Sequence, residues 1–207
     1  MLQKNNPHFW MLLLSYIALS ACVKSLSPVQ FNREVGADED FFRTDSCSSF
    51  KLYMRYLPPA LVAFRELKPL ETVSEGAFTE ALGNYKNQLT FQVKVATRNN
   101  ENLLTSLAPN VDDYNVLNRY FAYEFGQNFY ILAGSDTIRA SACTYQNSFG
   151  MTPDANFLVV FPNIIGQKNI SVCYTDVLFS CNTPIKFEFE QSTLNKPLQE
   201  LKWPQFN

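Results

Sequence analysis

Apolar and polar residues alternate along much of the chain, and this pattern predicts a domain built mainly of β-strands. The alternation is clearest over 89–95 (LTFQVKV) and 185–190 (IKFEFE). Because successive side chains of a strand point to opposite faces, a period of two predicts strands with one buried face. Shorter apolar runs, each bounded by Gly, Pro, Asn or Asp, predict further strands at 129–133, 137–145, 157–161 and 171–179.

Turn and helix signals complete this pattern. The sequence Gly-Ser-Asp at 134–136 predicts a hairpin over 129–145. Residues 74–84 and 100–107 each predict a short helix. Residues 114–125 fit a helix, and their second half also fits a strand, so we favour a helical turn followed by a strand. The predicted fold class is therefore mainly β: an antiparallel β-sandwich or barrel-like domain with one or two short helices.

The first 21 residues have the layout of an export signal. Lys4 is the one full charge among them, and an apolar run from Phe9 to about Ala21 follows it. This run is roughly 13 residues long, whereas a membrane-spanning helix needs about 20. We therefore expect residues 1–21 to be removed as a signal peptide.

Leu19-Ser20-Ala21-Cys22, at the end of this run, resembles the lipobox of bacterial lipoproteins. The resemblance implies cleavage before Cys22, attachment of a diacylglycerol to its thiol, and acylation of the new amino terminus. Two or three acyl chains hold a protein stably on a membrane, so Cys22 is the predicted lipid anchor. The alternative is an ordinary secretory leader whose cleavage site precedes a cysteine.

Removal of the leader changes the chemistry that the chain can support. The full chain has 17 basic and 19 acidic side chains, and loss of Lys4 leaves 16 basic ones, so no basic excess points to nucleic acid. The only histidine, His8, is lost as well. Its loss excludes Ser/His and Cys/His catalysis and imidazole metal sites. Because nucleotide-binding and nucleophile motifs are also missing, we expect a non-catalytic protein without a cofactor or metal.

Four cysteines remain besides Cys22, which in an exported chain predicts two disulfides. Cys173 and Cys181 are close in sequence and are expected to close a hairpin, which leaves Cys47 to pair with Cys143. The alternative is buried free thiols, because sequence spacing alone does not show that two Cα atoms approach each other.

The remaining chain divides into a tether, one domain and a tail. Residues 22–45 show neither helical nor strand period and are expected to form a flexible tether. Residues 46–190 have the length of one β-rich domain with its own core. In the tail, 191–207, four apolar residues are candidates for docking on a partner or for packing on the domain itself: Leu194, Leu198, Leu201 and Trp203.

Residues 129–161 are similar to uncharacterised envelope lipoproteins of the Bacteroidota, in which a strand and a G-x-D-T turn precede a second strand. This resemblance implies an envelope location and a β-rich fold, and it carries no activity. Asp136-Thr137-Ile138 also resembles the three-residue O-glycosylation signal that Bacteroidota use on exported proteins. Thr137 is therefore a candidate modification site.

The residues after the lipidated cysteine bear on location. Residues 23–25 (VKS) lack the aspartate that commonly retains lipoproteins in the inner membrane. They also lack the acidic run that often marks surface export in Bacteroidota. The resemblance to lipoproteins therefore implies the outer membrane, with the domain facing the periplasm.

Two functions from different classes remain open at this stage. The first is a non-catalytic accessory or binding subunit of an outer-membrane protein complex, held in place by acyl chains on Cys22. The second is a lipid-anchored protein that binds glycans on aromatic side chains or hydrolyses them with two carboxylates. The hydrolytic version requires two carboxylates about 5 to 10 Å apart in an aromatic-lined cleft.

Overall fold

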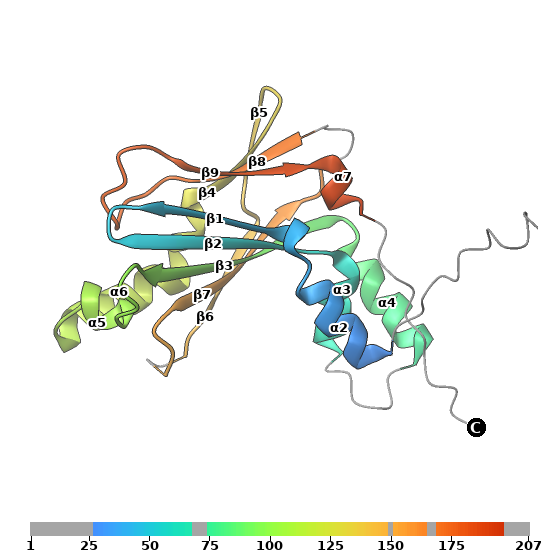
Figure 1. Cartoon of the computed structure of the whole chain (residues 1–207), viewed down its shortest axis with the longest axis horizontal. Coiled ribbons are helices and arrows are strands. Elements are labelled where there is room, and N and C mark those ends of the chain that lie inside the picture. Colours follow the sequence, from blue (N-terminus) through green and yellow to red (C-terminus); the bar gives the residue numbers. More distant parts are fainter. Residues whose placement is uncertain (1–26, 68–73, 149–150, 165–168, 197–207) are drawn as a thin grey trace, which may run out of the picture.

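The computed structural model describes residues 27–67, 74–148, 151–164 and 169–196, which form two antiparallel β-sheets (Figure 1). The larger sheet has the strand order β1-β2-β3-β7-β6, and the smaller has the order β5-β4-β8-β9. The strands of the larger sheet are β1 (Phe42–Cys47), β2 (Phe50–Leu57), β3 (Gln88–Thr97), β7 (Ala155–Pro162) and β6 (Ala142–Gln146). Those of the smaller sheet are β5 (Asp136–Arg139), β4 (Phe129–Ala133), β8 (Asn169–Tyr174) and β9 (Ile185–Glu190).

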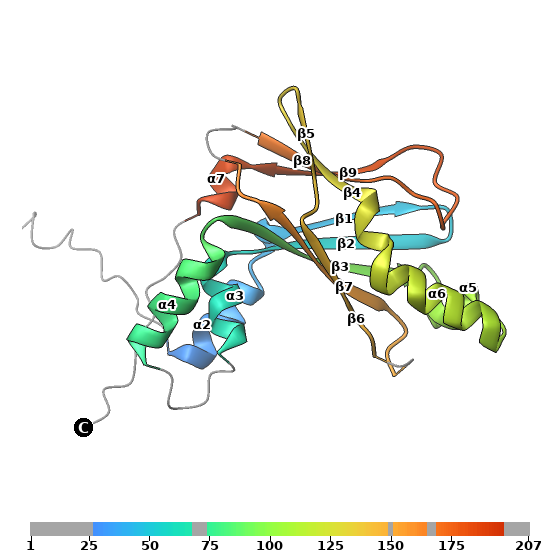
Figure 2. The same ribbon diagram turned by 180° about the vertical axis from the view of Figure 1, so that it is seen from behind.

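Helices gather at the two ends of the sheets. The helices of the described residues are α2 (Pro28–Gly36), α3 (Pro59–Glu66), α4 (Glu75–Tyr85), α5 (Leu103–Leu107), α6 (Val111–Tyr123), α7 (Gln191–Leu194) and the 3-10 turns η1 (Glu39–Phe41) and η2 (Phe125–Asn128). In both views, α2, α3 and α4 lie together at one end and α5 and α6 at the opposite end (Figure 1 and Figure 2). The predicted mainly β, sandwich-like class is confirmed, but helices are more numerous than the one or two expected.

The two sheets approach each other at both edges. At one edge, Arg43 of β1 donates from Nε to the carbonyl of Glu188 in β9 (2.9 Å), and its guanidinium lies 5.0 Å from the centre of the Phe189 ring. At the other edge the chain passes directly from β5 to β6, and the N–H of Ser141 donates to the carbonyl of Val160 (2.8 Å). The fold is therefore a sandwich whose sheets lie side by side at the β1–β9 edge and are joined directly by the chain at the β5–β6 edge.

Aromatic residues fill the space between the sheets. The Phe125 ring in η2 lies 4.1 Å from that of Phe157 in the larger sheet, and 5.3 and 5.4 Å from those of Phe129 and Tyr174 in the smaller one. All four side chains are essentially inaccessible to solvent. The abundance of aromatics in the sequence is thus explained in large part by the core, where offset and edge-on ring pairs are favourable.

The strand predictions succeeded where one face of the strand is buried. Predicted strands are confirmed as β3, β4, β7 and β9, and the hairpin between β4 and β5 is confirmed. The predicted strand 137–145 is wrong as a single element, because the chain crosses between sheets at 140–141 and forms β5 on one side and β6 on the other. The strand expected at the end of 114–125 is also wrong, since α6 and η2 occupy it and bury Leu117, Phe121 and Phe125.

The tether predicted for 22–45 is wrong from residue 28 onward. Ser27 and Gln30 form a reciprocal capping box at the start of α2, which stabilises its first turn. Phe31 and Val35, four residues apart on one helical face, are buried, and the Phe31 ring lies 5.5 Å from that of Phe64 in α3. The helical period of this segment was not recognised in the sequence, because α2 is only nine residues long.

The C-terminal part of the described chain packs against its N-terminal part, near α2 and η1. Lys196, just after α7, pairs through Nζ with the carboxylates of Asp38 (2.7 Å) and Asp40 (2.5 Å) beside η1. The hydroxyl of Tyr56 donates to the carbonyl of Leu194 (3.4 Å). The domain therefore extends on both sides of the predicted 46–190. Among the described residues, no helix is long and apolar enough to cross a membrane.

Candidate functional site

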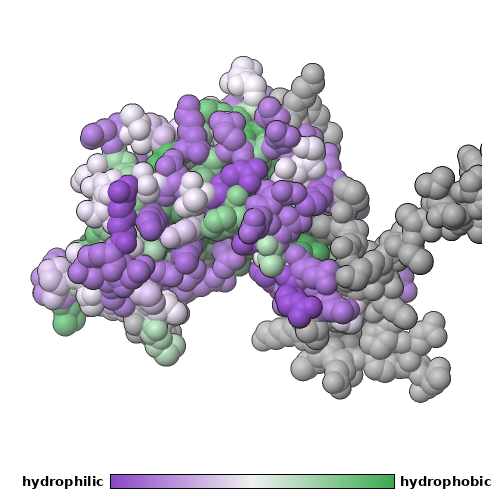
Figure 3. Space-filling view, in the orientation of Figure 1, coloured by the Kyte–Doolittle hydropathy of each residue, from purple (hydrophilic) through white to green (hydrophobic). Residues whose placement is uncertain are grey.

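A partly apolar groove of about 380 Å³ lies between α6 and the loop that joins β8 to β9, residues 175–184, called here the β8–β9 loop. It is lined by Leu107, Asp113, Val116, Leu117, Arg119, Tyr120, Glu124, Val177 and Leu178. Val116 is 57% exposed and Val177 is 65% exposed, so the groove presents two branched apolar side chains to solvent. Figure 3 shows that the face of the molecule seen in Figure 1 is largely hydrophilic, with small apolar areas over the strands.

The sequence of α6 explains why its apolar residues divide between core and groove. Asn110 caps the helix, since its side chain accepts a hydrogen bond from the N–H of Asp113 (3.0 Å). Leu117 and Phe121, four residues apart, are buried against the sheets. Val116 and Tyr123, seven residues apart, share another face, and Tyr123 is 77% exposed. One short helix thus contributes to both the core and an exposed apolar surface.

The other wall of the groove is held in place by one carboxylate, that of Asp176. It accepts hydrogen bonds from the N–H groups of Leu178 (2.9 Å), Phe179 (2.8 Å) and Cys181 (2.7 Å), and from the hydroxyl of Tyr174 (3.2 Å). Burial acts to raise the pKa of Asp176, but these donors outweigh it and the pKa is lowered from its ordinary value. The side chain therefore remains ionised at neutral pH and fixes the backbone of the β8–β9 loop.

Replacement of this carboxylate should make the stability of the domain less dependent on pH. Because the folded-state pKa of Asp176 is lowered, its contribution is present above the unfolded-state pKa of about 3.9 and is lost as the pH falls through the folded-state value. We expect Asp176→Asn to lower the free energy of unfolding by about 2 kcal/mol at neutral pH. The difference from the wild type should shrink below about pH 4.

Urea unfolding at several pH values measures this difference. Asp136→Asn, at the exposed first residue of β5, is the matched control and should change stability by less than about 0.5 kcal/mol. A loss for Asp176→Asn that stays constant from neutral pH to about pH 3 would show that the carboxylate charge does not contribute.

The same loop carries a disulfide that the sequence did not predict correctly. Cys47, at the end of β1, is bonded to Cys181 across 134 positions of sequence, with the two Cα atoms 5.6 Å apart. The expected pairs Cys173–Cys181 and Cys47–Cys143 are wrong, and Cys143 and Cys173 are free thiols. Cys47 and Cys143 lie on the two edge strands of one five-stranded sheet, about 19 Å apart at the usual strand spacing. Cys173 lies near the end of β8, where it is paired with Lys186 of β9.

The two free thiols are not suited to nucleophilic chemistry. Burial raises the pKa of Cys143 to about 11 and also raises that of Cys173. Since the thiolate is the reactive form, both groups are largely unreactive at neutral pH. Cys143 also packs against Gly126. A Cβ added at position 126 would overlap the Cβ of Cys143, so this close approach requires glycine.

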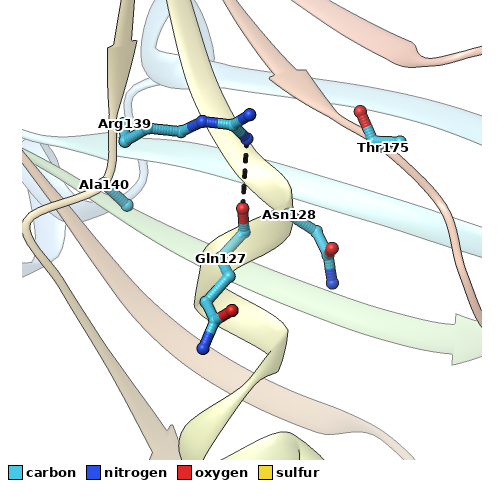
Figure 4. A pocket seen from close by; sticks show the side chains of 5 residues that line it. All are labelled: Gln127, Asn128, Arg139, Ala140 and Thr175. Atoms are coloured by element: carbon cyan, nitrogen blue, oxygen red, sulfur yellow. Dashed lines mark hydrogen bonds between the residues drawn. The ribbon is translucent and has the colours of Figure 1, made fainter.

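A second, more polar pocket of about 550 Å³ opens where the chain crosses between the sheets (Figure 4). It is lined by Gln127, Asn128, Arg139, Ala140 and Thr175. The guanidinium of Arg139 donates to the carbonyl of Gln127 (3.2 Å) and lies 5.4 Å from the centre of the Tyr130 ring. The lining supplies hydrogen-bonding groups and one positive charge, without a carboxylate or thiol that could act as a base or nucleophile.

A partly buried series of polar side chains connects this pocket with the groove. Asn128 donates from its side-chain amide to the hydroxyl of Tyr120 (2.7 Å), which lines the groove. Tyr120 interacts in turn with Tyr174, whose hydroxyl donates to Asp176. Burial raises the pKa of both tyrosines, so both hydroxyls stay protonated at neutral pH. These polar contacts run from the lining of the pocket to the lining of the groove.

The acidic residues of the groove do not meet the spacing of a glycosidase pair. Asp113 and Glu124 are separated by eleven positions along α6, which corresponds to about 16 Å. The carboxylates of glycosidases lie about 5 to 10 Å apart. Hydrolysis of glycans by these two residues is therefore not supported.

The remaining predicted site residues are placed as follows. Thr137 is exposed at the start of β5, next to the turn, where a modifying enzyme can reach it. Leu194 packs against the core and is half-buried. Cys22, Leu198, Leu201 and Trp203 lie outside the described residues. The residues that form the groove were not identified from the sequence, because Val116 and Val177 come together only in the tertiary structure.

The fold and groove together define a β-sandwich-like domain with a terminal apolar groove. No family model and no curated protein matches the chain. A solved structure of a novel protein of unknown function from Burkholderia pseudomallei is similar, with a TM-score of 0.40 and 10% identity over 82% of this chain and 92% of that one. A DUF4426 family protein from Pseudomonas aeruginosa has a TM-score of 0.33 and 9% identity over 73% of this chain and 93% of that one. At these TM-scores, neither likeness carries an argument about function.

Proposed function

We propose that this chain is a lipid-anchored envelope protein, acting as a non-catalytic accessory or binding subunit of an outer-membrane protein complex. The observation that carries the proposal is the groove of α6 and the β8–β9 loop, where Val116 and Val177 expose branched apolar side chains. Exposed apolar surface of this kind, rimmed by charged residues, is typical of sites that bind other proteins.

The position of the groove relative to the anchor supports this proposal. The predicted anchor, Cys22, precedes Ser27 by five residues, which span at most about 18 Å of extended chain. The end that carries α2, α3 and α4 would therefore face the bilayer closely. The groove lies at the opposite end of the domain, directed away from the membrane that we expect to be the outer membrane (Figure 1). An anchored domain of this shape can present its groove to a periplasmic part of a complex.

Site-specific photo-cross-linking in intact membranes tests the proposal. A photoreactive amino acid placed at position 116 of the full-length protein should give one discrete adduct with a partner protein. The matched control is the same amino acid at position 80, because Glu80 is exposed on α4 at the opposite end of the domain. We expect no corresponding adduct from position 80.

A double variant of the groove and a variant of the anchor test the two parts of the proposal separately. Val116→Asp together with Val177→Asp should reduce recovery of the partner by about tenfold and leave thermal stability nearly unchanged, since both side chains are exposed. Cys22→Ala should release the protein from the membrane fraction. Identical adducts from positions 116 and 80, or no partner at either, would argue against a binding subunit that uses this groove.

A further inference from the structure

The outer face of the five-stranded sheet is basic, although the chain as a whole has a formal net charge of −2. In the strand register, Tyr53 of β2 pairs with Lys94 of β3, and Lys94 pairs with Asn156 of β7. Directly paired residues share a face, so these side chains project together from the sheet. Arg55 and Lys51 lie two residues to either side of Tyr53 and belong to the same face.

The centre of this face is a shallow hollow of about 240 Å³ with an aromatic floor. The rings of Phe42 and Tyr53 are stacked, with centres 6.0 Å apart. The guanidinium of Arg55 lies 5.1 Å from the centre of the Phe42 ring, and the ammonium of Lys94 lies 4.5 Å from that of Tyr53. Cation–π contacts thus hold both positive charges in defined places, which lowers the entropy lost when they bind a ligand.

Of the two cations in the hollow, Arg55 donates to neutral groups, and Lys94 is paired with one carboxylate. Arg55 donates to the neutral carbonyls of Gly36 (2.7 Å) and Asp38 (3.2 Å). Lys94 lies 3.3 Å from the carboxylate of Asp154, in a partly exposed pair that solvent screens. In the neighbouring loop, Arg98 donates to the hydroxyl of Ser46 (2.8 Å), which belongs to the same face. The face therefore attracts an anion more strongly than the net charge of the chain indicates.

We infer that this face binds an acidic polysaccharide. Arg55 and Lys94 in the hollow, with Lys51 farther along the same face of β2, supply the charges that recognise its carboxylates. The amide side chains of Gln92 and Asn156 match its hydroxyl groups. A sugar polymer fits better than an acidic peptide, because β2 and β3 are interior strands whose backbone groups are already paired and cannot accept an added strand. This inference does not depend on the groove of α6 or on the proposed partner protein.

Binding of polygalacturonate to the full-length protein in detergent tests the inference, with dextran as the neutral comparison. We expect saturable binding of polygalacturonate by isothermal titration calorimetry, no binding of dextran, and weakening as the salt concentration rises from about 50 to about 500 mM. Lys51→Gln with Lys94→Gln should weaken binding by about tenfold. Lys86→Gln with Lys186→Gln removes the same charge from exposed positions elsewhere and should change affinity by less than about twofold.

Three outcomes would overturn the inference. The first is no binding of polygalacturonate at low salt. The second is an equal loss in both double variants, which would show attraction to the whole molecule rather than to this face. The third is tighter binding of poly-glutamate than of polygalacturonate, which would assign the face to acidic polypeptides. Circular dichroism and thermal unfolding of each variant establish that a loss of binding is not a loss of folding.

Discussion

Removal of the Cys47–Cys181 disulfide should lower the free energy of unfolding by about 4 kcal/mol. The bond closes a loop across 134 positions, and in the chain-entropy description cross-links over loops of this length restrict the unfolded chain strongly. The expected result for Cys47→Ser with Cys181→Ser is a large shift of the urea midpoint to lower concentration, with a steeper slope because the unfolded chain without the cross-link exposes more surface. Reduction of the wild-type protein should reproduce the shift.

The matched control for this experiment is Cys143→Ala. Cys143 is a free, half-buried thiol, and its replacement should cost about 1 kcal/mol and be insensitive to reducing agent. Peptide mapping of the unreduced protein should recover Cys47 and Cys181 in one linked fragment. A double variant as stable as the wild type, or linked peptides containing Cys173, would contradict the assignment of the bond.

The disulfide should also affect binding through the groove. Cys181 belongs to the β8–β9 loop, and the same loop presents Val177 and Leu178 to α6. Without the bond, the carboxylate of Asp176 remains as the main constraint on this loop. Cross-linking from position 116 should therefore be weaker in the double cysteine variant even under conditions in which the domain is folded.

Phe125→Ala should cost about 4 kcal/mol, because this side chain contacts both sheets and is fully buried. Its ring lies between Phe157 on one side and Phe129 and Tyr174 on the other, so truncation leaves a cavity that neither sheet can fill without moving. Thermal and urea unfolding measure the loss.

Tyr123→Ala, two positions earlier in the chain, is the control for Phe125→Ala. Tyr123 is 77% exposed at the end of α6, and its truncation should change stability by less than about 0.5 kcal/mol. If both variants lost similar stability, the buried side chain of Phe125 would not be the specific link between the sheets.

The two proposed surfaces can be tested separately because they lie on different elements. The groove uses α6 and the β8–β9 loop, and the basic face uses the outer side of β1, β2, β3 and β7. Substitution at position 116 should leave polygalacturonate binding unchanged. Substitution at positions 51 and 94 should leave the cross-linked adduct unchanged. A protein that retains one activity and loses the other would place each function on its own surface.

The sequence by itself determined the mainly β character of the domain. In β3 and β9, apolar residues alternate with polar ones because one face of each strand is buried, and this local period is readable without the rest of the chain. The helix α4 was readable for a similar reason, since Ser74 caps it in a sequence with helical spacing. The leader and Cys22 were interpreted from local sequence alone, and they remain predictions.

The tertiary structure decided what local patterns do not contain. The sheet order brings Cys47 of β1 next to Cys181, although Cys173 is far closer in sequence. It divides 137–145 between two sheets, and it packs α2 against α3 where the sequence predicted a tether. Both candidate surfaces arise in the same way. Val116 and Val177 line one groove, and Arg55 and Lys94 line one hollow, only because elements distant in sequence pack together. Contacts between distant segments depend on how all the elements bury their apolar faces together, and no single stretch of sequence specifies that arrangement.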